Sequence, residues 1–308
     1  MNSIVVKIKN GLGNQMFQYA LGRKLSILNN CPLSFDISEY SSDLRNHESI
    51  ELNIHRFNVV SEIANYSEVE RIISKRKFSC KILNYLVFIC NRLVGPFFFY
   101  KRDYIKDEWN DNMNVLKVKA PSYLEGDWVN MHYFESIEEQ LRKELSLKKE
   151  LENYYYNDLK TQILNTPNSI GIHFRRNYEK LSPANEYFGV LPLTYYYEAL
   201  THLKKIINAD LSIFVFSDNP IWVADNFITS HNIKILYRSD LLTDAHEFEL
   251  LKSCKHQIIA NSTYSWWAAY LNNNDEKVVI APKKWYLNYK AQKWYEKGYL
   301  TPKEWTLV

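Results

Sequence analysis

The stretch Ser169-Ile170-Gly171-Ile172-His173-Phe174-Arg175-Arg176 decides how the chain is organised. It opens as a short apolar run typical of a buried strand, and it ends in an imidazole and two guanidinium groups. In open α/β sheets ligands bind beyond the carboxyl ends of the strands, so these side chains are expected at a ligand rather than in a core. Two adjacent arginines suit a diphosphate. The octet alone also fits a surface arginine pair with a helix-capping histidine.

Around this stretch, strand and helix patterns alternate regularly. Strand-like apolar runs cover residues 170–174, 211–216, 233–237, 257–260 and 278–281. Helical patterns lie between them, following Leu191-Pro192, beginning at Pro220, spanning residues 245–254 and following Asn261. Strands that alternate with helices of this length form right-handed crossovers and a parallel sheet.

The first half of the chain begins in the same way. A strand over residues 4–8 leads into the turn Lys9-Asn10-Gly11-Leu12-Gly13-Asn14-Gln15, then a helix, then a second strand over residues 33–36. The turn lets the backbone approach a ligand closely. Met16 stands where the dinucleotide fingerprint has its third glycine, so an NAD-dependent oxidoreductase is disfavoured. The economical architecture is two Rossmann-like α/β domains, residues 1–166 and 167–308, facing each other across a cleft. Whether the last helix packs back on the first domain stays open.

Composition excludes several classes of protein. The chain has 308 residues, 46% of them hydrophobic, enough for two domains, and its net charge of +3 gives no indication of nucleic-acid binding. Its 4 cysteines are scattered, which argues against a disulfide framework or a zinc site and for reduced thiols in the cytoplasm. No basic segment and apolar core precede the first strand, so no signal peptide is expected.

One apolar stretch has two interpretations. Residues 81–99 are rich in Leu, Phe, Ile and Val but are interrupted by charged residues and a proline, so the stretch is too short to span a membrane. A helix packed in the core is the first interpretation. The second is a patch, flanked by basic side chains between residues 75 and 102, that rests on an anionic bilayer. The charged segment 135–152 is predicted to be a helix with one solvated side.

Polar side chains follow two further strands of the second half. Ser217-Asp218-Asn219-Pro220 comes after one, and Asn261-Ser262-Thr263-Tyr264-Ser265 opens a helix after another. Small hydroxyl residues at a helix N-terminus make an anion site, although the same residues also make ordinary helix caps. Of the adjacent Trp266 and Trp267, we expect one in the core and one lining the cleft. The chain has no Asp-x-Asp sequence, the usual metal clamp of a nucleotide diphosphate, so no metal ligands are assigned.

Several long motifs, taken together, carry a family resemblance. They are residues 11–20 (GLGNQMFQYA), His173-Phe174-Arg175-Arg176, Leu191-Pro192-Leu193 with Tyr195-Tyr196, residues 214–218 (FVFSD) and residues 255–267 (KHQIIANSTYSWW). In type and order these resemble the motifs of the bacterial α-1,2-fucosyltransferases, glycosyltransferase family 11. The His-x-Arg-Arg motif is also shared by α-1,6- and protein O-fucosyltransferases.

The resemblance implies a GT-B fold and an activity. It implies inverting transfer of L-fucose from GDP-β-L-fucose to the 2-hydroxyl of a galactoside, without metal or other cofactor, in surface-polysaccharide synthesis. Carried over by motif, Arg175 contacts the leaving group and Arg176 the pyrophosphate, while His173 and Asp218 address the nucleoside. The other residues implied in sugar-donor binding are Asn14, Gln15, Ser217, Asn261, Ser262, Thr263 and Ser265. The acceptor is expected to be lipid-linked, with the enzyme in the cytoplasm or peripheral on the inner membrane.

One departure from the family pattern leaves alternatives open. The family continues His-x-Arg-Arg with Gly-Asp-Tyr, whereas here Arg176 is followed by Asn177-Tyr178-Glu179, so the loop is shorter and lacks one carboxylate. Glu179 would substitute for it or be a solvated surface acid. The alternatives are transfer of a different GDP-sugar and a non-catalytic GDP-sugar-binding relative. For the catalytic base, Asp36 and Asp127 are weak candidates.

Overall fold

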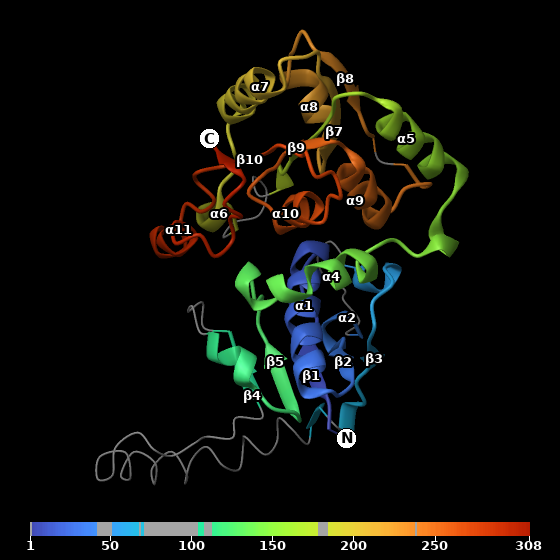
Figure 1. Cartoon of the computed structure of the whole chain (residues 1–308), viewed down its shortest axis with the longest axis vertical. Helices are drawn as coiled ribbons and strands as arrows, with labels where there is room; N and C mark the ends of the chain where they lie inside the picture. Colours follow the sequence, from blue (N-terminus) through green and yellow to red (C-terminus); the bar gives the residue numbers. More distant parts are fainter. Residues whose placement is uncertain are drawn as a thin grey trace. The chain divides into compact units, whose positions relative to one another are not determined.

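Two parallel β-sheets, each in its own compact unit, organise the computed structural model (Figure 1). The structure describes residues 2–41, 51–67, 69–70, 104–107, 113–177, 184–237 and 239–308. The first unit comprises Met1–Leu52 and Val59–Glu138, and the second comprises Asn53–Asn58 and Glu139–Val308. The predicted division of the chain into two α/β halves is therefore correct in kind.

The first unit contains a five-stranded sheet with the order β3-β2-β1-β5-β4, all strands parallel. Its strands are β1 (Ile4–Lys7), β2 (Leu33–Asp36), β3 (Glu62–Ile63), β4 (Tyr104–Lys106) and β5 (Ser122–Glu125). Helix α1 (Leu12–Asn29) packs on one face so closely that a Cβ atom at Gly22 would lie 2.5 Å from a methyl carbon of Val6. The predicted opening strand, helix and second strand are thus confirmed.

Short helices complete the first unit. They are α2 (Ser38–Ser41), η2 (Met113–Lys117), η3 (Met131–Tyr133) and η4 (Glu135–Ile137). Helix α1 ends at Asn30, whose φ of 47° places it in the left-handed region that asparagine tolerates. Asn30 is therefore the C-cap of α1.

The second unit contains a six-stranded parallel sheet with the order β11-β10-β9-β6-β7-β8. Its strands are β6 (Ser169–Phe174), β7 (Ser212–Ser217), β8 (Asn232–Ile235), β9 (His256–Ile258), β10 (Val279–Ala281) and β11 (Thr306–Leu307). The predicted helices appear as α7 (Leu193–Ile207), α8 (Pro220–Asn226), α9 (Asp244–Ser253) and α10 (Thr263–Tyr270). Strand β11 and the helices α5 (Tyr154–Asn165) and α6 (Ala184–Phe188) were not predicted, and the expected last helix is α11 (Tyr289–Tyr295).

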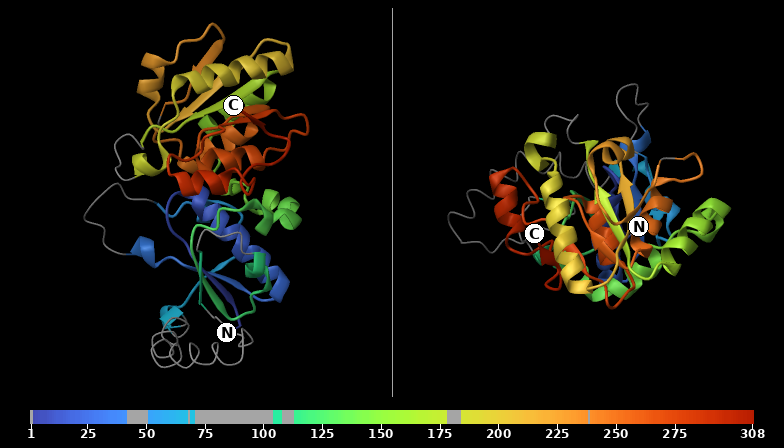
Figure 2. Two further views of the ribbon diagram at one scale, coloured as in Figure 1. Left: turned by 90° about the vertical axis from the view of Figure 1, so that its left-hand side faces the viewer. Right: turned by 90° about the horizontal axis from the view of Figure 1, so that it is seen from above.

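Strand β6 lies inside this sheet, between β9 and β7, and its side chains pack alternately against the helices on the two faces. Ile170, Ile172 and Phe174 are buried in a cluster with residues of α7. Gly171 points to the other face, where an added Cβ atom would lie 2.6 Å from a leucine methyl carbon of α9. Figure 2 shows α7 and α9 on opposite sides of the sheet. His173 has the same parity as Gly171, so it projects toward the layer of α9 and α10.

The strand order places a ligand-binding position at the end of β6. From β6 the chain builds outward through β7 and β8, and it then returns to the other side of β6 with β9, β10 and β11. The direction of winding therefore reverses between β6 and β9. Open α/β sheets bind ligands at such a switch point, beyond the carboxyl ends of the strands.

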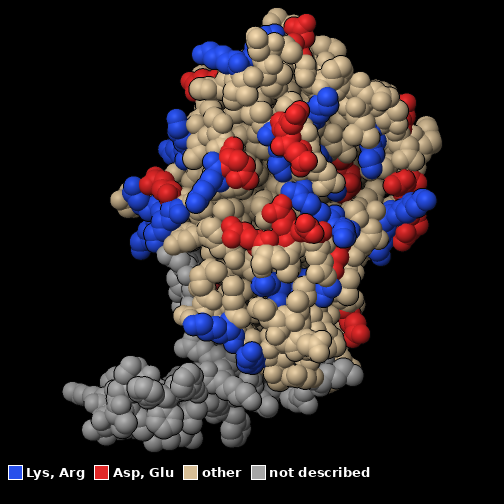
Figure 3. All heavy atoms as spheres, viewed as in Figure 1, with Lys and Arg blue, Asp and Glu red and all other residues tan. Residues whose placement is uncertain are grey.

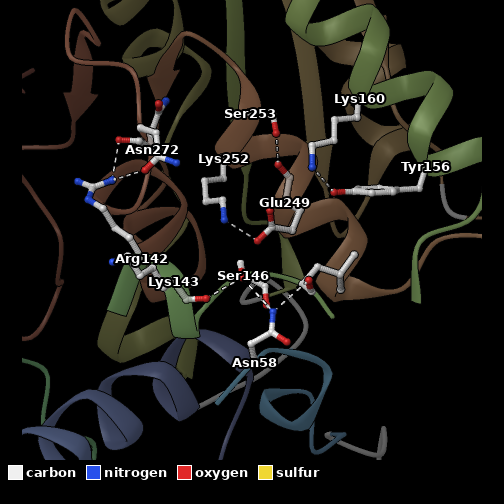
Figure 4. A network of polar contacts seen from close by, with 12 residues as sticks. Asn58, Arg142, Lys143, Ser146, Tyr156, Lys160, Glu249, Lys252, Ser253 and Asn272 are labelled. Atoms are coloured by element: carbon white, nitrogen blue, oxygen red, sulfur yellow. Dashed lines mark hydrogen bonds and ion pairs between the residues drawn. The ribbon is translucent and has the colours of Figure 1, made fainter. Parts of the chain in front are cut away.

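The unit boundary differs from the one predicted at residue 166. Arg142, on α4 (Glu138–Glu144), donates a hydrogen bond of 2.9 Å to the carbonyl oxygen of Asn272 (Figure 4). It donates a second of 2.9 Å to the carbonyl oxygen of Tyr270, the last residue of α10. The amide of Asn58 donates to the carbonyl and hydroxyl oxygens of Ser146. These contacts attach residues 139–166 to the second unit, because the helix-end carbonyls need hydrogen-bond donors from outside the helix.

The predicted helix over residues 135–152 also needs correction. The predicted helix over 135–152 ends at Glu144 and is followed by the short η5 (Lys149–Leu151) and then by α5. Helix α5 lies against α9, and the rings of Tyr156 and His246 are 5.1 Å apart. The last helix, α11, belongs to the second unit, where Trp285 packs against its Tyr295.

The apolar stretch 81–99, for which a core helix and a membrane patch were the two interpretations, lies outside the described residues, and so does Glu179. Within the described part of the chain, no helix is long and apolar enough to cross a membrane. On the face drawn in Figure 3, acidic and basic side chains of the described residues lie interspersed, in keeping with the small net charge.

Candidate functional site

The predicted polar residues of the second half meet at the carboxyl ends of three neighbouring strands. His173 is the fifth residue of β6, and Arg175 and Arg176 follow that strand; Asp218 follows β7, and Ser262 caps the helix after β9. Strand β6 pairs with both β7 and β9, so these strand ends are adjacent. The sheet therefore gathers an imidazole, two guanidinium groups, a carboxylate and a helix N-terminus at its switch point.

His173 is a buried, neutral base. It is 5% exposed, its ring centroid is 5.3 Å from that of Tyr264, and its Nδ1 atom is buried without a hydrogen-bond partner among the described residues. The pKa of the imidazole is lowered from 6.5 to about 4, chiefly by burial; the Asp218 carboxylate opposes this shift, and the Arg175 charge adds to it. A neutral imidazole can accept or donate one hydrogen bond to a ligand without titrating near pH 7.

Arg175 reaches across to the next strand. Its Nη1 atom lies 3.1 Å from Oδ2 of Asp218, whose side chain is 6% exposed, whereas the Arg175 side chain is 33% exposed. The guanidinium group is therefore held from its protein side by a buried carboxylate and remains accessible to solvent. A fixed, partly exposed arginine is suited to binding a phosphate.

Arg176 occupies a different environment from its neighbour. It is 8% exposed, and its guanidinium carbon lies 3.5 Å from the ring centroid of Trp222, on α8. Helix α8 is positioned for this contact because Asn219 caps it, accepting a hydrogen bond from the Trp222 amide, and Pro220 occupies its first position. The Ser217 hydroxyl accepts a hydrogen bond from the Asn219 amide and so stabilises the same turn.

Helix α10 presents an N-terminus whose N-cap residue, Ser262, makes no side-chain capping bond. Ser262 is 6% exposed and Thr263 is half-buried. The first N–H groups of a helix lack intrahelical partners, and they favour a bound anion. These two residues keep the position that the sequence predicted for them.

The remaining polar residues of this strand end and the two tryptophans of α10 are buried. Asn261 is 2% exposed and donates hydrogen bonds to the carbonyl oxygens of Phe188, Gly189 and Trp285, so its amide joins two loops of the protein. Ser265 is fully buried and bonds to carbonyl oxygens of its own turn. Both tryptophans of α10, at 266 and 267, are fully buried, so neither lines a ligand site.

In the first unit, Asn14 and Gln15 lie in the first turn of α1 with different surroundings. Asn14 is half-buried, whereas Gln15 is completely buried. The Gln15 amide donates to the carbonyl oxygens of Asn10 and Glu51 and to the hydroxyl of Tyr40. These bonds stabilise the turn before α1, and the part of Gln15 in sugar-donor binding stays a prediction.

The two candidate catalytic bases, Asp36 and Asp127, lie in different environments. Asp36 is 8% exposed and accepts hydrogen bonds from the Tyr123 hydroxyl, at 2.6 Å, and from the Ser38 amide. Asp127 keeps a side-chain exposure of 23%, and its Oδ1 atom accepts a 2.9 Å hydrogen bond from Asn10. The bonds around Asp36 give it a structural role, so Asp127 is the better of the two candidates.

Comparison with known proteins gives this arrangement a family. The model of glycosyl transferase family 11 matches residues 3–308. The chain belongs to glycosyl transferase family 11. This glycosyltransferase is 31% identical to the O-antigen biosynthesis glycosyltransferase WbnK of Escherichia coli, over 91% of this chain and 93% of that protein. It is 28% identical to an α-1,2-colitosyltransferase of Escherichia coli, over 93% of each chain.

Solved structures confirm the fold of this family 11 enzyme. A mutant of Arabidopsis thaliana FUT1 in complex with GDP superposes with a TM-score of 0.51 at 12% identity, over 90% of this chain and 70% of that one. The fold is the α/β, two-domain GT-B type. Both sheets of the glycosyltransferase have the Rossmann-like parallel arrangement that was predicted.

Sequence reasoning missed two aromatic contacts of the glycosyltransferase site and one pocket that the site residues do not line. Trp222 supports Arg176, and Tyr264 covers His173. A pocket of about 600 Å³ opens at the start of α9 beside Asp244, whose carbonyl oxygen accepts a hydrogen bond from the Tyr264 hydroxyl. For Trp222, one sequence signal was available: it is the third residue of a helix that begins directly after a strand end. Among the described residues, no group of His, Cys, Asp and Glu side chains could hold a metal ion.

Proposed function

We propose that this family 11 glycosyltransferase transfers L-fucose from GDP-β-L-fucose to the 2-hydroxyl of a galactoside, with inversion and without a metal ion. The observation that carries the proposal is Arg175, partly exposed at the switch point and held by Asp218. Its charge would meet the GDP leaving group as the bond to the sugar breaks. Arg176, Ser262 and Thr263 add positive charge and hydrogen-bond donors at the same edge of the sheet.

A second sugar donor has its own support. One relative is named as a colitosyltransferase, and the loop after Arg176 is shorter than the family pattern. Colitose is fucose without its 3-hydroxyl group, so the loop would distinguish the two sugars through one hydrogen bond. A site that binds a sugar hydroxyl discriminates strongly against an analogue lacking it.

The biological setting follows from the relative named for O-antigen biosynthesis. We propose that the acceptor is a galactose-terminated, lipid-linked oligosaccharide and that the enzyme acts in the cytoplasm at the inner membrane. Cell fractionation tests this placement: the protein should sediment with membranes at low salt and be released at high salt if its membrane contact is peripheral and electrostatic. A protein that stays in the soluble fraction at low salt would contradict the membrane contact.

The function is tested by a donor assay in EDTA. The purified enzyme is incubated with β-galactoside acceptors and one sugar donor at a time: GDP-fucose, GDP-colitose or GDP-mannose. The linkage of each product is determined by NMR. We expect an α-1,2-fucosyl product. Transfer from GDP-colitose alone would establish the second sugar donor, and GDP binding without transfer to any acceptor would favour a non-catalytic relative. Activity lost in EDTA and restored by a divalent cation would contradict metal independence.

A variant pair assigns the leaving-group contact. Arg175→Ala should lower kcat/KM by about 100-fold or more, as expected when one charge-stabilising group is removed. Lys205→Ala, which removes an exposed cation from α7 in the same unit, is the matched control and should leave turnover unchanged. Near-normal turnover of the Arg175 variant would overturn the role given to this residue.

A further inference from the structure

The buried carboxylate of Asp218 receives two backbone hydrogen bonds and one ion pair from three consecutive residues at the neighbouring strand end. Its Oδ1 accepts from the backbone N–H of Arg176 at 2.7 Å, and its Oδ2 accepts from the backbone N–H of Asn177 at 3.1 Å. Its Oδ2 also lies 3.1 Å from Nη1 of Arg175. The register explains this convergence, since Phe174 pairs with Ser217 and the next residue of each strand lies alongside.

The turn that carries Asp218 is fixed by contacts of its own. The Asn219 amide donates to the Ser217 hydroxyl, and the Asn219 side chain caps α8. The first turn of α8 then supplies Trp222, on which Arg176 is stacked. Both arginines are thus positioned by residues of one β7–α8 turn, Arg175 through a charge and Arg176 through an aromatic face.

These contacts conflict with a nucleoside contact for Asp218. Two N–H groups of a guanine edge would need both oxygens of the carboxylate, and each oxygen already accepts at least one hydrogen bond from the protein. The side chain is 6% exposed, so a base would reach it only by displacing Arg175 or the backbone. Displacement would leave buried N–H groups without acceptors, which is unfavourable.

We propose that Asp218 is a positioning residue: it holds the Arg175 guanidinium group where the diphosphate of the sugar donor binds, and it does not read the guanine base. This inference rests on the proposed function, because it takes the ligand of Arg175 to be the diphosphate of the sugar donor. An arginine held in one orientation before the ligand arrives loses less conformational freedom on binding, so affinity and turnover both gain. The contribution of Asp218 therefore depends on Arg175 being present.

The test is a double-mutant cycle measured by calorimetry with GDP, with IDP, which lacks the guanine 2-amino group, and with inorganic pyrophosphate. Asp218→Asn should weaken the binding of all three ligands by a similar factor of about 10, the size expected for one charged hydrogen bond. In the Arg175→Ala background the same substitution should change affinity less than twofold. Asp210→Asn is the matched control, since Asp210 precedes β7 at the opposite edge of the sheet and is fully exposed.

Distinct results would overturn the inference. If Asp218→Asn weakens GDP but leaves IDP and pyrophosphate unchanged, the carboxylate reads the base. If the effects of the two substitutions simply multiply, Asp218 acts on the fold and not through Arg175. Should Asp218→Asn fail to fold, Asp218→Glu keeps the charge and must retain GDP binding through Arg175; loss of binding in a folded Glu variant would contradict the proposal. A wild-type enzyme that binds no GDP would refute the proposed function itself, whatever Asp218 does.

Discussion

Replacing His173 by Gln should flatten the dependence of stability on pH. Burial holds the pKa of His173 at about 4 in the folded protein, whereas an unfolded chain has its ordinary value of 6.5. Between these values the unfolded state binds the proton more tightly than the folded state. The stabilisation from the neutral histidine is therefore fully present above pH 6.5 and is lost as the pH falls toward 4.

The size of the effect follows from the pKa difference. One pKa unit corresponds to about 1.4 kcal/mol, so lowering the pH from 6.5 to 5.0 removes about 2 kcal/mol from the free energy of unfolding. Gln stays neutral over this range, so the His173→Gln variant loses none of this free energy of unfolding. The pKa of His256 is also lowered by burial, but both proteins share that contribution, and it cancels in the comparison.

Urea denaturation at pH 7.5 and pH 5.0 measures the difference. The wild-type protein should lose about 2 kcal/mol more than His173→Gln on acidification, which corresponds to about 4–8 °C in melting temperature for a unit of this size. His202→Gln, the same chemical change at an exposed position of α7, is the matched control. Equal losses in wild type and His173→Gln, or an NMR titration of His173 near pH 6.5, would refute the burial argument.

Three further substitutions test the packing around the site. Gly171→Ala should destabilise the protein by about 1–3 kcal/mol, because the new methyl group would meet a leucine methyl carbon 2.6 Å away; a melting temperature equal to wild type would show that α9 can shift. Arg142→Ala should cost about 2 kcal/mol by removing the cap of α10, with exposed Lys143→Ala as its control in the same urea titration. Trp222→Leu should cost about 1–2 kcal/mol and raise the KM for the sugar donor, since Arg176 loses its stacking partner; an unchanged KM would separate Arg176 from ligand binding.

The local sequence pattern was sufficient to predict the strands and helices of the second half and the edge of the sheet at which the site lies. Strands are short apolar runs, and the helices between them show apolar periodicity and capping residues, so both were legible in residues 169–281. The position of His173 and Arg175 at the end of β6 follows from the same pattern, because a strand's polar end is a property of consecutive residues. The unit boundary was not local, since it depends on Arg142 and Asn58 finding partners far along the chain.

By itself, therefore, the sequence determined the two α/β halves, the order of their elements and the residue types gathered at the switch point. Only the tertiary structure decided which hydrogen-bond partners these polar side chains have within the protein. Gln15 and Asn261 have the same hydrogen-bonding groups as ligand-binding residues, yet their amides are used by carbonyl oxygens distant in sequence. The same holds for Asp218, whose partners come from the neighbouring strand. The type of a polar residue determines which hydrogen bonds its side chain can make. The packing of segments distant in sequence determines which groups are its partners.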